Sequence, residues 1–321
     1  MVQGRVEDLH PGTGISPSVV EAGILDRLAA VVLLSGSVRP TRLSGSLGLA
    51  LPELPVDDQQ TVLDVWRQQV NGLAHHLHRT SLPVRVVFDR ATLLPAPPSG
   101  NGHAAFQMES DPRDYRGTGG VLRDIAAQYK PSDYLLAGNG AQLMMRSLAE
   151  VAEALASLEA DVAVVSHRDG TPTGIMLLRC GALAAIPATG FVDMKEQALP
   201  RIAQQFRVKV AHFQTATALP TRTLTQYIHA LRLFHQQRAD PTAVHDPFAE
   251  NIEPTFSIVQ KGADVDATAR IHDSVVMSGA RVEAGAILVR SLVCRGAVIR
   301  RNQHVVDRLV AGSGPAAGGR N

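Results

Sequence analysis

The most chemically informative part of the chain is residues 31–56, where an apolar run leads into a turn of small residues and then a Thr-Arg-Leu triplet. The run at 31–34 predicts a buried strand, and the turn that follows it consists of Ser35, Gly36 and Ser37. Backbone amides in such a turn can donate hydrogen bonds to a phosphate. Arg42 lies in the triplet and Arg39 shortly before it, so guanidinium groups also favour an anionic ligand here.

Alternating strand and helix patterns surround this turn and must hold it in place. The spacing of apolar residues predicts a short helix at 24–30 and longer helices at 62–79, 119–130 and 147–160, with another within 212–235. Strands are predicted at 84–89, 104–109, 134–139 and 161–167. Such alternation is typical of an α/β domain with a mainly parallel sheet, in which ligands bind at the carboxyl ends of the strands.

Two further segments place glycines and short polar residues where these elements meet. A Gly-Thr-Gly-Gly string opens a predicted helix with Gly117, Thr118, Gly119 and Gly120. Asn139 and Gly140 end the strand predicted at 134–139. Glycines at a helix start let a base or a phosphate approach the backbone, although the string alone favours an ordinary glycine-rich helix start. Its position between the first turn and the next strand favours ligand binding.

In order along the chain, these segments resemble the signatures of the sugar-1-phosphate nucleotidyltransferases, also called NDP-sugar pyrophosphorylases. The first family signature reads LAGGxGTRL followed by PKPLLPV, and this chain has SGSVRPTRL and ALPELPV. The agreeing residues are Gly36, Thr41, Arg42, Leu43, Pro52, Leu54, Pro55 and Val56. Ser37 and Pro40 replace glycines, and Leu51 replaces a lysine that contacts phosphate in the family. The resemblance therefore implies that a charge-assisted contact has been lost.

The next two matches concern the nucleotide and the metal. Residues 113–129 resemble the GTAGAL segment that the family places against the nucleotide, and residues 134–144 resemble a strand ending in NGDQ. The implied nucleotide-binding residues are Ser35, Gly36, Ser37, Gly117, Thr118, Gly119, Gly120, Asn139 and Gly140. The aspartate of NGDQ holds the catalytic Mg²⁺ in the family, and Ala141 occupies its position. Alanine offers no oxygen to a hard cation.

Two later segments complete the resemblance. The second metal aspartate of the family lies in a Trp-Asp-(Ile/Thr)-Gly segment before a helix, and counting back from Tyr227 places Pro220 there. The resemblance thus implies no metal site. Residues 190–202 resemble the sugar-phosphate segment, with Lys195 and Glu196 as candidate contacts and Asp193 in support. A helix start with solvated charges explains these three residues equally well, because Asp in a first turn stabilises the helix dipole.

The pattern changes to a hexapeptide repeat between residues 258 and 299. Apolar residues recur every six positions and, after one shortening, continue in the same period: Val259, Val265, Ile271, Val276, Val282, Leu288 and Cys294. Such repetition predicts a parallel β-helix in which each coil buries its inward residues on the next. The pattern is similar to the left-handed β-helix appended to many pyrophosphorylases, where it usually promotes subunit association.

The chain is therefore expected to have four parts: an N-terminal extension at 1–28, a nucleotidyltransferase-like (Rossmann-like) mixed-sheet domain at 29–245, a left-handed parallel β-helix at 246–310 and a flexible tail at 311–321. The 321 residues are 45% hydrophobic with a formal net charge of +1, which implies no nucleic-acid partner. Two cysteines without framework spacing and the lack of a membrane-length apolar window predict a cytoplasmic protein. We expect a homo-oligomer, or a hetero-oligomer with a catalytic homologue.

Three functional hypotheses follow. The preferred one is a noncatalytic or regulatory member that binds a sugar nucleotide or sugar phosphate and needs no cofactor. The second is an active sugar-1-phosphate nucleotidyltransferase that releases pyrophosphate, with Arg39 or Arg42 replacing the lysine and Asp193 or Glu196 binding Mg²⁺. The third is a structural assembly protein, which requires no ligand pocket.

Overall fold

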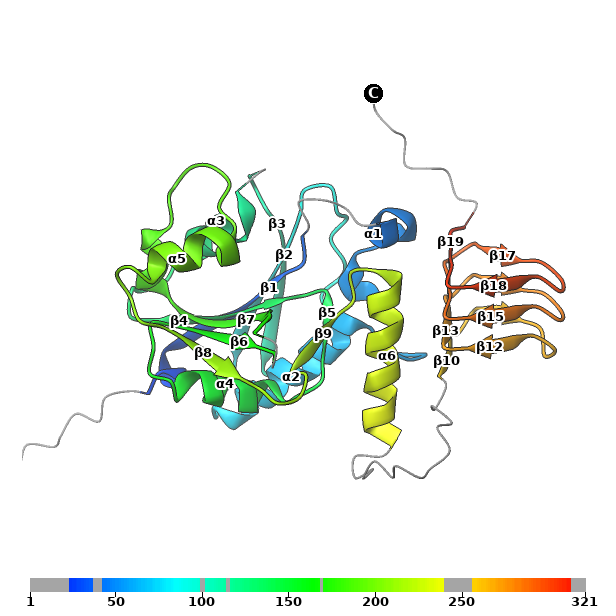
Figure 1. The fold of residues 1–321 in the computed structure, drawn as a ribbon, viewed down its shortest axis with the longest axis horizontal. Helices are drawn as coiled ribbons and strands as arrows, with labels where there is room; N and C mark the ends of the chain where they lie inside the picture. Colours follow the sequence, from blue (N-terminus) through cyan, green and yellow to red (C-terminus); the bar gives the residue numbers. More distant parts are fainter. Residues whose placement is uncertain are drawn as a thin grey trace, which may run out of the picture.

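The computed structural model describes residues 23–36, 42–98, 102–113, 116–167, 170–239 and 256–312. Figure 1 shows an α/β domain built on a central sheet, a stack of short strands near the C-terminus, and helix α6 between them. Most of the predicted extension at 1–28 and tail at 311–321 lies outside the described residues. So do Ser37, Arg39 and the side chain of Arg42.

Seven strands form the central sheet in the order β3-β2-β1-β4-β7-β6-β8. Their bounds are β1 Leu28–Leu34, β2 Leu82–Phe88, β3 Ala104–Ser110, β4 Tyr134–Asn139, β6 Val162–Ser166, β7 Pro172–Arg179 and β8 Val208–His212. Strands β1 to β4 run parallel, β7 is antiparallel to β4 and β6, and β8 pairs parallel with β6. The predicted mixed α/β sheet is confirmed, with β7 as the strand that reverses direction.

Helices cover both faces of this sheet (Figure 1). The helices are α1 Arg42–Leu47, α2 Val62–His76, α3 Gly117–Ala126, α4 Leu148–Ala156, α5 Leu199–Ile202 and α6 Leu224–Ala239. Short turns of other helix types are Leu25–Arg27, Leu51–Glu53, Cys180–Ala185 and the π-helical turn Met194–Ala198 (η4). Val31 and Leu33 of β1 pack with α2 and α4, whereas Ala30 and Val32 pack with α3. This alternation follows from the two-residue period of a strand.

Helix α2 fixes the end of strand β4. Thr61 caps the helix, because its hydroxyl accepts from the Asp64 amide at 3.2 Å while the Asp64 carboxylate accepts from the Thr61 amide at 3.0 Å. Trp66, only 1% exposed, donates its indole N–H to the Gln142 carbonyl at 3.1 Å. A Cβ at Gly138 would lie 3.1 Å from the Trp66 ring, so the strand needs glycine there. The residues that follow Gly138 are held against the core in this way.

Most predicted elements are present, and one is wrong. The helix predicted at 24–30 is a single 3₁₀ turn, Leu25–Arg27, and β1 already begins at Leu28. Leu28 and Ala30 are fully buried, and they lie on opposite faces of the sheet because the pairing with β4 shifts register between them. A short apolar run buried on both faces resembles a buried helical segment in sequence. Strands β7 and β8 were not predicted. Nor was the small antiparallel pair of β5 Gln142–Met144 with β9 Ala218–Pro220.

The C-terminal stack, residues 256–312, consists of short strands in three parallel sheets. The sheets contain β10 Ser257–Val259, β13 Ser274–Val276, β16 Leu292–Val293 and β19 Leu309–Val310; β11 Asp264–Val265, β14 Arg281–Val282 and β17 Val298–Ile299; and β12 Arg270–His272, β15 Ile287–Val289 and β18 His304–Val306. Paired residues lie 17 positions apart, as in Ile258 with Val275 and Val275 with Leu292. Each passage through the three sheets therefore takes 17 residues.

This register corrects one detail of the repeat. A 17-residue passage divides as six, six and five, so the shortening recurs in every passage rather than once. Val293, not Cys294, consequently continues the inward row and is fully buried beside Val276 and Leu288. Cys294 faces the cluster that contains α6. Val259 begins the row and is 37% exposed.

The C-terminal stack packs against α6. Phe256 stacks on the His235 ring with 5.7 Å between centroids, and the Asp273 carboxylate pairs with Arg232. Phe256 and Cys294 share one buried cluster with Tyr227 of α6. The helix therefore joins the stack to the core of the α/β domain.

Candidate functional site

The carboxyl ends of β1 and β4 meet at the point where the chain changes direction across the sheet. From β1 the chain proceeds outward to β2 and β3, and it returns to β4 on the other side of β1. Ligands of such sheets bind at this switch point. The Gly140 amide donates to the Leu34 carbonyl at 3.0 Å, and a Cβ at Gly140 would lie 2.0 Å from Ser35 Oγ. The structure thus brings Ser35 and Gly140, two predicted site residues, together.

Several amides of this turn are already engaged by the protein. The Ser35 amide donates to the Val87 carbonyl at 2.8 Å, in addition to the Gly140 bond. A Cβ at Gly36 would lie 2.8 Å from the Asp89 amide nitrogen, so Gly36 is required by packing against the end of β2. The Asn139 side chain accepts from the Ala141 amide at 2.9 Å. These amides are therefore not free to donate to a phosphate as predicted, and a ligand at this edge would contact mainly side chains.

The glycines at the start of α3 lie against other parts of the protein and do not border an open space. Gly117 has φ of +69°, and a Cβ there would lie 2.4 Å from the Val192 carbonyl oxygen. The Gly119 amide donates to that same oxygen at 2.9 Å, and Thr118 Oγ1 accepts from the Met194 amide at 3.0 Å. Gly117 and Gly119 thus allow α3 to pack closely against the segment before η4. A Cβ at Gly120 would lie 3.0 Å from the Arg116 side chain.

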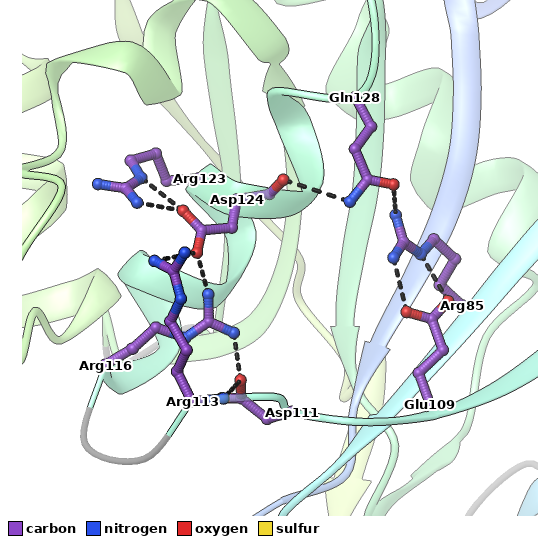
Figure 2. Close-up of polar contacts among 8 residues, drawn as sticks. All are labelled: Arg85, Glu109, Asp111, Arg113, Arg116, Arg123, Asp124 and Gln128. Atoms are coloured by element: carbon purple, nitrogen blue, oxygen red, sulfur yellow. Dashed lines mark hydrogen bonds and ion pairs between the residues drawn. The ribbon is translucent and has the colours of Figure 1, made fainter.

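A network of arginines and carboxylates holds the segment that leads into α3. Figure 2 shows Arg116 bonded to Asp111 and Asp124, with Arg123 on the other side of Asp124. Arg113 lies 3.5 Å from Asp124. Burial alone would raise the pKa of Asp124, but the hydrogen bond from Arg123 and the charges of Arg116, Arg123 and Arg113 hold it below its usual range. The network fixes the start of α3.

A cavity of about 360 Å³ lies beside this network and extends to Arg85. Arg85 forms a two-pronged contact with Glu109, at 2.7 and 2.6 Å, and donates to Gln128 at 2.8 Å. These charged groups satisfy one another. The cavity is therefore lined by ion pairs that hold β2, β3 and α3 together.

The positions that would carry catalysis in the resembled family are apolar and packed. Leu51 is 7% exposed and Ala141 is 3% exposed, and both belong to the main hydrophobic core. Pro220 pairs with Gln142 across the β5–β9 ladder, and the next amide, of Thr221, donates to the Ala141 carbonyl at 3.0 Å. Ala141 and Pro220 are therefore neighbours in space.

Of the three predicted sugar-phosphate residues, Asp193 and Lys195 make hydrogen bonds within the protein, and Glu196 is exposed to solvent. Asp193 caps η4, because its carboxylate accepts from the amides of Lys195 at 2.8 Å and Glu196 at 3.0 Å. Lys195 Nζ donates to the Pro172 carbonyl at 3.0 Å, at the start of β7. Desolvation lowers the pKa of Lys195, Asp193 opposes this effect, and the positive charge of Arg222 lowers the pKa further. Glu196 is exposed.

Lys195 lies at the same sheet edge as Asn139. Strand β7 begins where its antiparallel neighbour β4 ends, and a Cβ at Gly174 would lie 3.9 Å from Asn139 Cβ. Lys195, bonded to Pro172 two residues before Gly174, therefore flanks the carboxyl end of β4.

The sequence reasoning missed three polar residues at this edge. Thr221 is fully buried and Gln142 is 3% exposed, and Arg222 follows Thr221 on the surface. Within the described part of the chain, Thr221 Oγ1, Gln142 Nε2 and Ser35 Oγ are buried without a hydrogen-bond partner. Unpartnered buried polar atoms are uncommon and costly. Thr221 and Arg222 occupy the last two positions of the Trp-Asp-(Ile/Thr)-Gly motif in which Pro220 replaces the aspartate, so the motif itself indicated them.

The described residues contain no group of three or more His, Cys, Asp or Glu side chains placed to hold a metal ion. Among the helices described, none has the length and apolar character needed to cross a membrane.

Two solved structures with a distant likeness to the chain are those of one protein, HddC, alone and in a complex. No protein-family model matches the chain, and no curated protein matches it. The structure of HddC from Yersinia pseudotuberculosis is 13% identical with a TM-score of 0.46, and the alignment covers 64% of this chain and 100% of HddC. HddC complexed with GMP-PN is 14% identical with a TM-score of 0.45 and the same coverage. Likeness of this degree assigns neither a family nor an activity.

Proposed function

We propose that the protein is a noncatalytic member of the nucleotidyltransferase-like proteins that binds a sugar nucleotide or a sugar phosphate at the carboxyl edge of β1 and β4. The observation that carries this proposal is the burial of Leu51 and Ala141 in the hydrophobic core. Enzymes that transfer nucleotidyl groups work mainly by positioning and by neutralising charge. A buried leucine and a buried alanine at the positions of a lysine and a metal aspartate supply neither.

Binding is supported by groups that the core does not need. Ser35 Oγ, Gln142 Nε2 and Thr221 Oγ1 are unpartnered within the described residues, and Lys195 stands at the same edge. A ligand with hydroxyl and phosphate oxygens would satisfy hydroxyl, amide and ammonium groups together.

The active-enzyme alternative has less support. Asp193, one substitute metal ligand, already accepts two backbone amides at the start of η4. Glu196, the other, is exposed at the surface of the same turn. Among the described residues, neither belongs to a group of three or more His, Cys, Asp or Glu side chains that could hold a metal ion.

Paired assays of binding and turnover test the proposal. Calorimetric titrations with ADP-, GDP-, UDP- and dTDP-sugars and with common sugar 1-phosphates should show binding to at least one of them. Mixtures of each nucleoside triphosphate with common sugar 1-phosphates and Mg²⁺ or Mn²⁺ should release no pyrophosphate. Turnover would refute the noncatalytic part of the proposal, and a complete lack of binding would refute the ligand-binding part.

We further propose that the C-terminal stack is a left-handed β-helix at 246–310 that follows the nucleotidyltransferase-like domain at 29–245 and joins subunits into an oligomer. The constant 17-residue register of its three parallel sheets supports this interpretation. Light scattering coupled to size exclusion should give a mass above the 34.2 kDa of one chain. A monomer at micromolar concentration would exclude the assembly role.

A further inference from the structure

The proposed site does not suit the divalent cation that the resembled family uses. Ala141 presents a methyl group and Pro220 a ring carbon at the two positions where a hard cation would need oxygen. The nearby oxygens are occupied, because the Ala141 carbonyl accepts from Thr221 and Asn139 Oδ1 accepts from the Ala141 amide. The donor set here is wrong for Mg²⁺.

Two cations stand at this edge. Lys195 is anchored at 3.0 Å to the Pro172 carbonyl, beside the carboxyl end of β4. Arg222 directly follows Thr221, whose amide is bonded to Ala141, and the arginine is exposed. In the family motif that places Pro220 at the aspartate, the position of Arg222 is a glycine. An aspartate has thus been lost and a guanidinium gained within three residues.

Lys195 and Arg222 repel each other, since the positive charge of Arg222 contributes to the lowered pKa of Lys195. Like charges brought together on a protein surface repel, and an anion between them relieves that repulsion. Thr221 precedes Arg222, and Gln142 pairs with Pro220 across the β5–β9 ladder. Thr221 Oγ1 and Gln142 Nε2 are buried and unpartnered within the described residues, and both are neutral groups that can donate to phosphate oxygens.

We propose that Lys195 and Arg222 form a metal-independent site for the phosphate or diphosphate group of the ligand. This inference rests on the proposed function and narrows it. A protein that replaces the carboxylates of a metal site by apolar residues and adds a guanidinium no longer needs Mg²⁺ to neutralise phosphate charge. Instead, Mg²⁺ bound to the diphosphate in solution would compete with the two side chains.

Calorimetry of the full-length protein with inorganic pyrophosphate, nucleoside diphosphates and NDP-sugars tests this, each in excess EDTA and in excess Mg²⁺. Binding should be at least as tight in EDTA as in Mg²⁺. Arg222→Ala and Lys195→Ala should each weaken it about tenfold or more, because each removes a charge-assisted contact. Arg222→Lys should retain part of the affinity, since it keeps the charge and loses the planar fork.

Arg207→Ala is the matched control. Arg207 is an exposed arginine just before β8, at the opposite edge of the sheet from Asn139, so its loss should leave affinity unchanged. Circular dichroism melts should show that all variants fold, as expected for exposed side chains. Binding that requires Mg²⁺ overturns this inference but leaves the proposed function standing, as does binding that Arg222→Ala does not weaken. No binding in either buffer overturns both.

Discussion

Replacing Gly117 by alanine is the sharpest test of how α3 is attached. Gly117 has φ of +69°, and left-handed backbone costs an alanine about 1 kcal/mol or more. The new Cβ would lie 2.4 Å from the Val192 carbonyl oxygen, which is backbone and must move. That movement breaks the 2.9 Å bond from the Gly119 amide and leaves a buried donor, at a cost of about 1–3 kcal/mol. The sum is roughly 2–5 kcal/mol of lost unfolding free energy.

Alanine substitutions at two other glycines give a scale for the stability loss of Gly117→Ala. A Cβ at Gly72, exposed inside α2, would meet nothing within 4 Å, so Gly72→Ala should stabilise by about 0.5–1 kcal/mol through helix propensity. A Cβ at Gly119 would lie 3.0 Å from the Val192 oxygen, so Gly119→Ala should fall between the other two variants. Urea unfolding followed by circular dichroism measures all three.

The relative stabilities of the three variants test whether the contact with Val192 constrains α3. If Gly117→Ala unfolds at the same urea concentration as the parent protein, the contact with Val192 does not constrain α3. If Gly117→Ala is destabilised but binds NDP-sugars as before, the glycine serves packing alone, and the family resemblance at this position reflects fold rather than ligand contact.

Three further predictions concern the core, the charge network and the lost metal position. Tyr227→Phe should lose about 1–2 kcal/mol in urea unfolding, because the fully buried hydroxyl donates to the Pro55 carbonyl and its removal leaves that oxygen unpaired. Asp124 has a depressed pKa, so its stabilisation is present above the unfolded value of about 4 and is lost as pH falls through the folded value. Asp124→Asn should therefore be less stable than the parent near neutral pH, with a gap that closes in acid melts; a constant gap would contradict the pairing. Ala141→Asp should destabilise by about 3 kcal/mol or more, since it places a carboxylate in the core at a 3% exposed site, and excess Mg²⁺ should not restore the melting temperature.

The sequence predicted the regular part of the fold because its signals are local. The Thr61–Asp64 capping pair and the apolar spacing of α2 define that helix without reference to the rest of the chain. The first strand was misjudged at its start, because the run from Leu28 is buried on both faces and such runs have no strand period. β5 and β9 could not be predicted, since each has three residues and exists only by pairing with a segment about 75 positions away.

The repeat shows how far periodicity alone reaches. Six-residue spacing predicted stacked parallel strands correctly, but the choice between Val293 and Cys294 depends on whether the five-residue step recurs. Both residues are apolar and both are buried, at 0% and 2% exposure, so composition cannot separate them. They differ only in which neighbour buries them: the inner row of the stack for Val293, and the cluster with α6 for Cys294.

The candidate site was predicted in part, because the order of the motifs along the chain identified the segments but not the contacts that their residues make. The glycines of α3 were expected at a ligand and lie against Val192. Asp193 was expected at a sugar phosphate and caps η4. The first outcome depends on a contact between α3 and the segment before η4, more than 70 residues apart, which no local pattern encodes. The second is local, because Asp193 accepts from the amides of Lys195 and Glu196, and it agrees with the alternative of an aspartate at a helix start. Thr221 and Gln142 lie inside segments of the resemblance, but the burial and missing hydrogen bonds of their side-chain atoms are visible only once their surroundings are known.

Helix α6 connects the candidate site to the C-terminal stack through backbone contacts of one short segment. Tyr227 bonds the Pro55 carbonyl and His235 lies 2.8 Å from the Val56 carbonyl, two turns along the same helix. The segment they hold includes Pro52, whose ring would lie 3.6 Å from a Cβ at Gly140. The stack contacts the same helix through Phe256 and Asp273. A rigid helix held at both ends transmits displacement, so a subunit contact that shifts the stack would be expected to alter ligand affinity at Gly140. Measuring NDP-sugar affinity in Asp273→Asn, which removes a stack contact far from any proposed ligand group, separates coupling from independent assembly: unchanged affinity would mean that the stack only assembles.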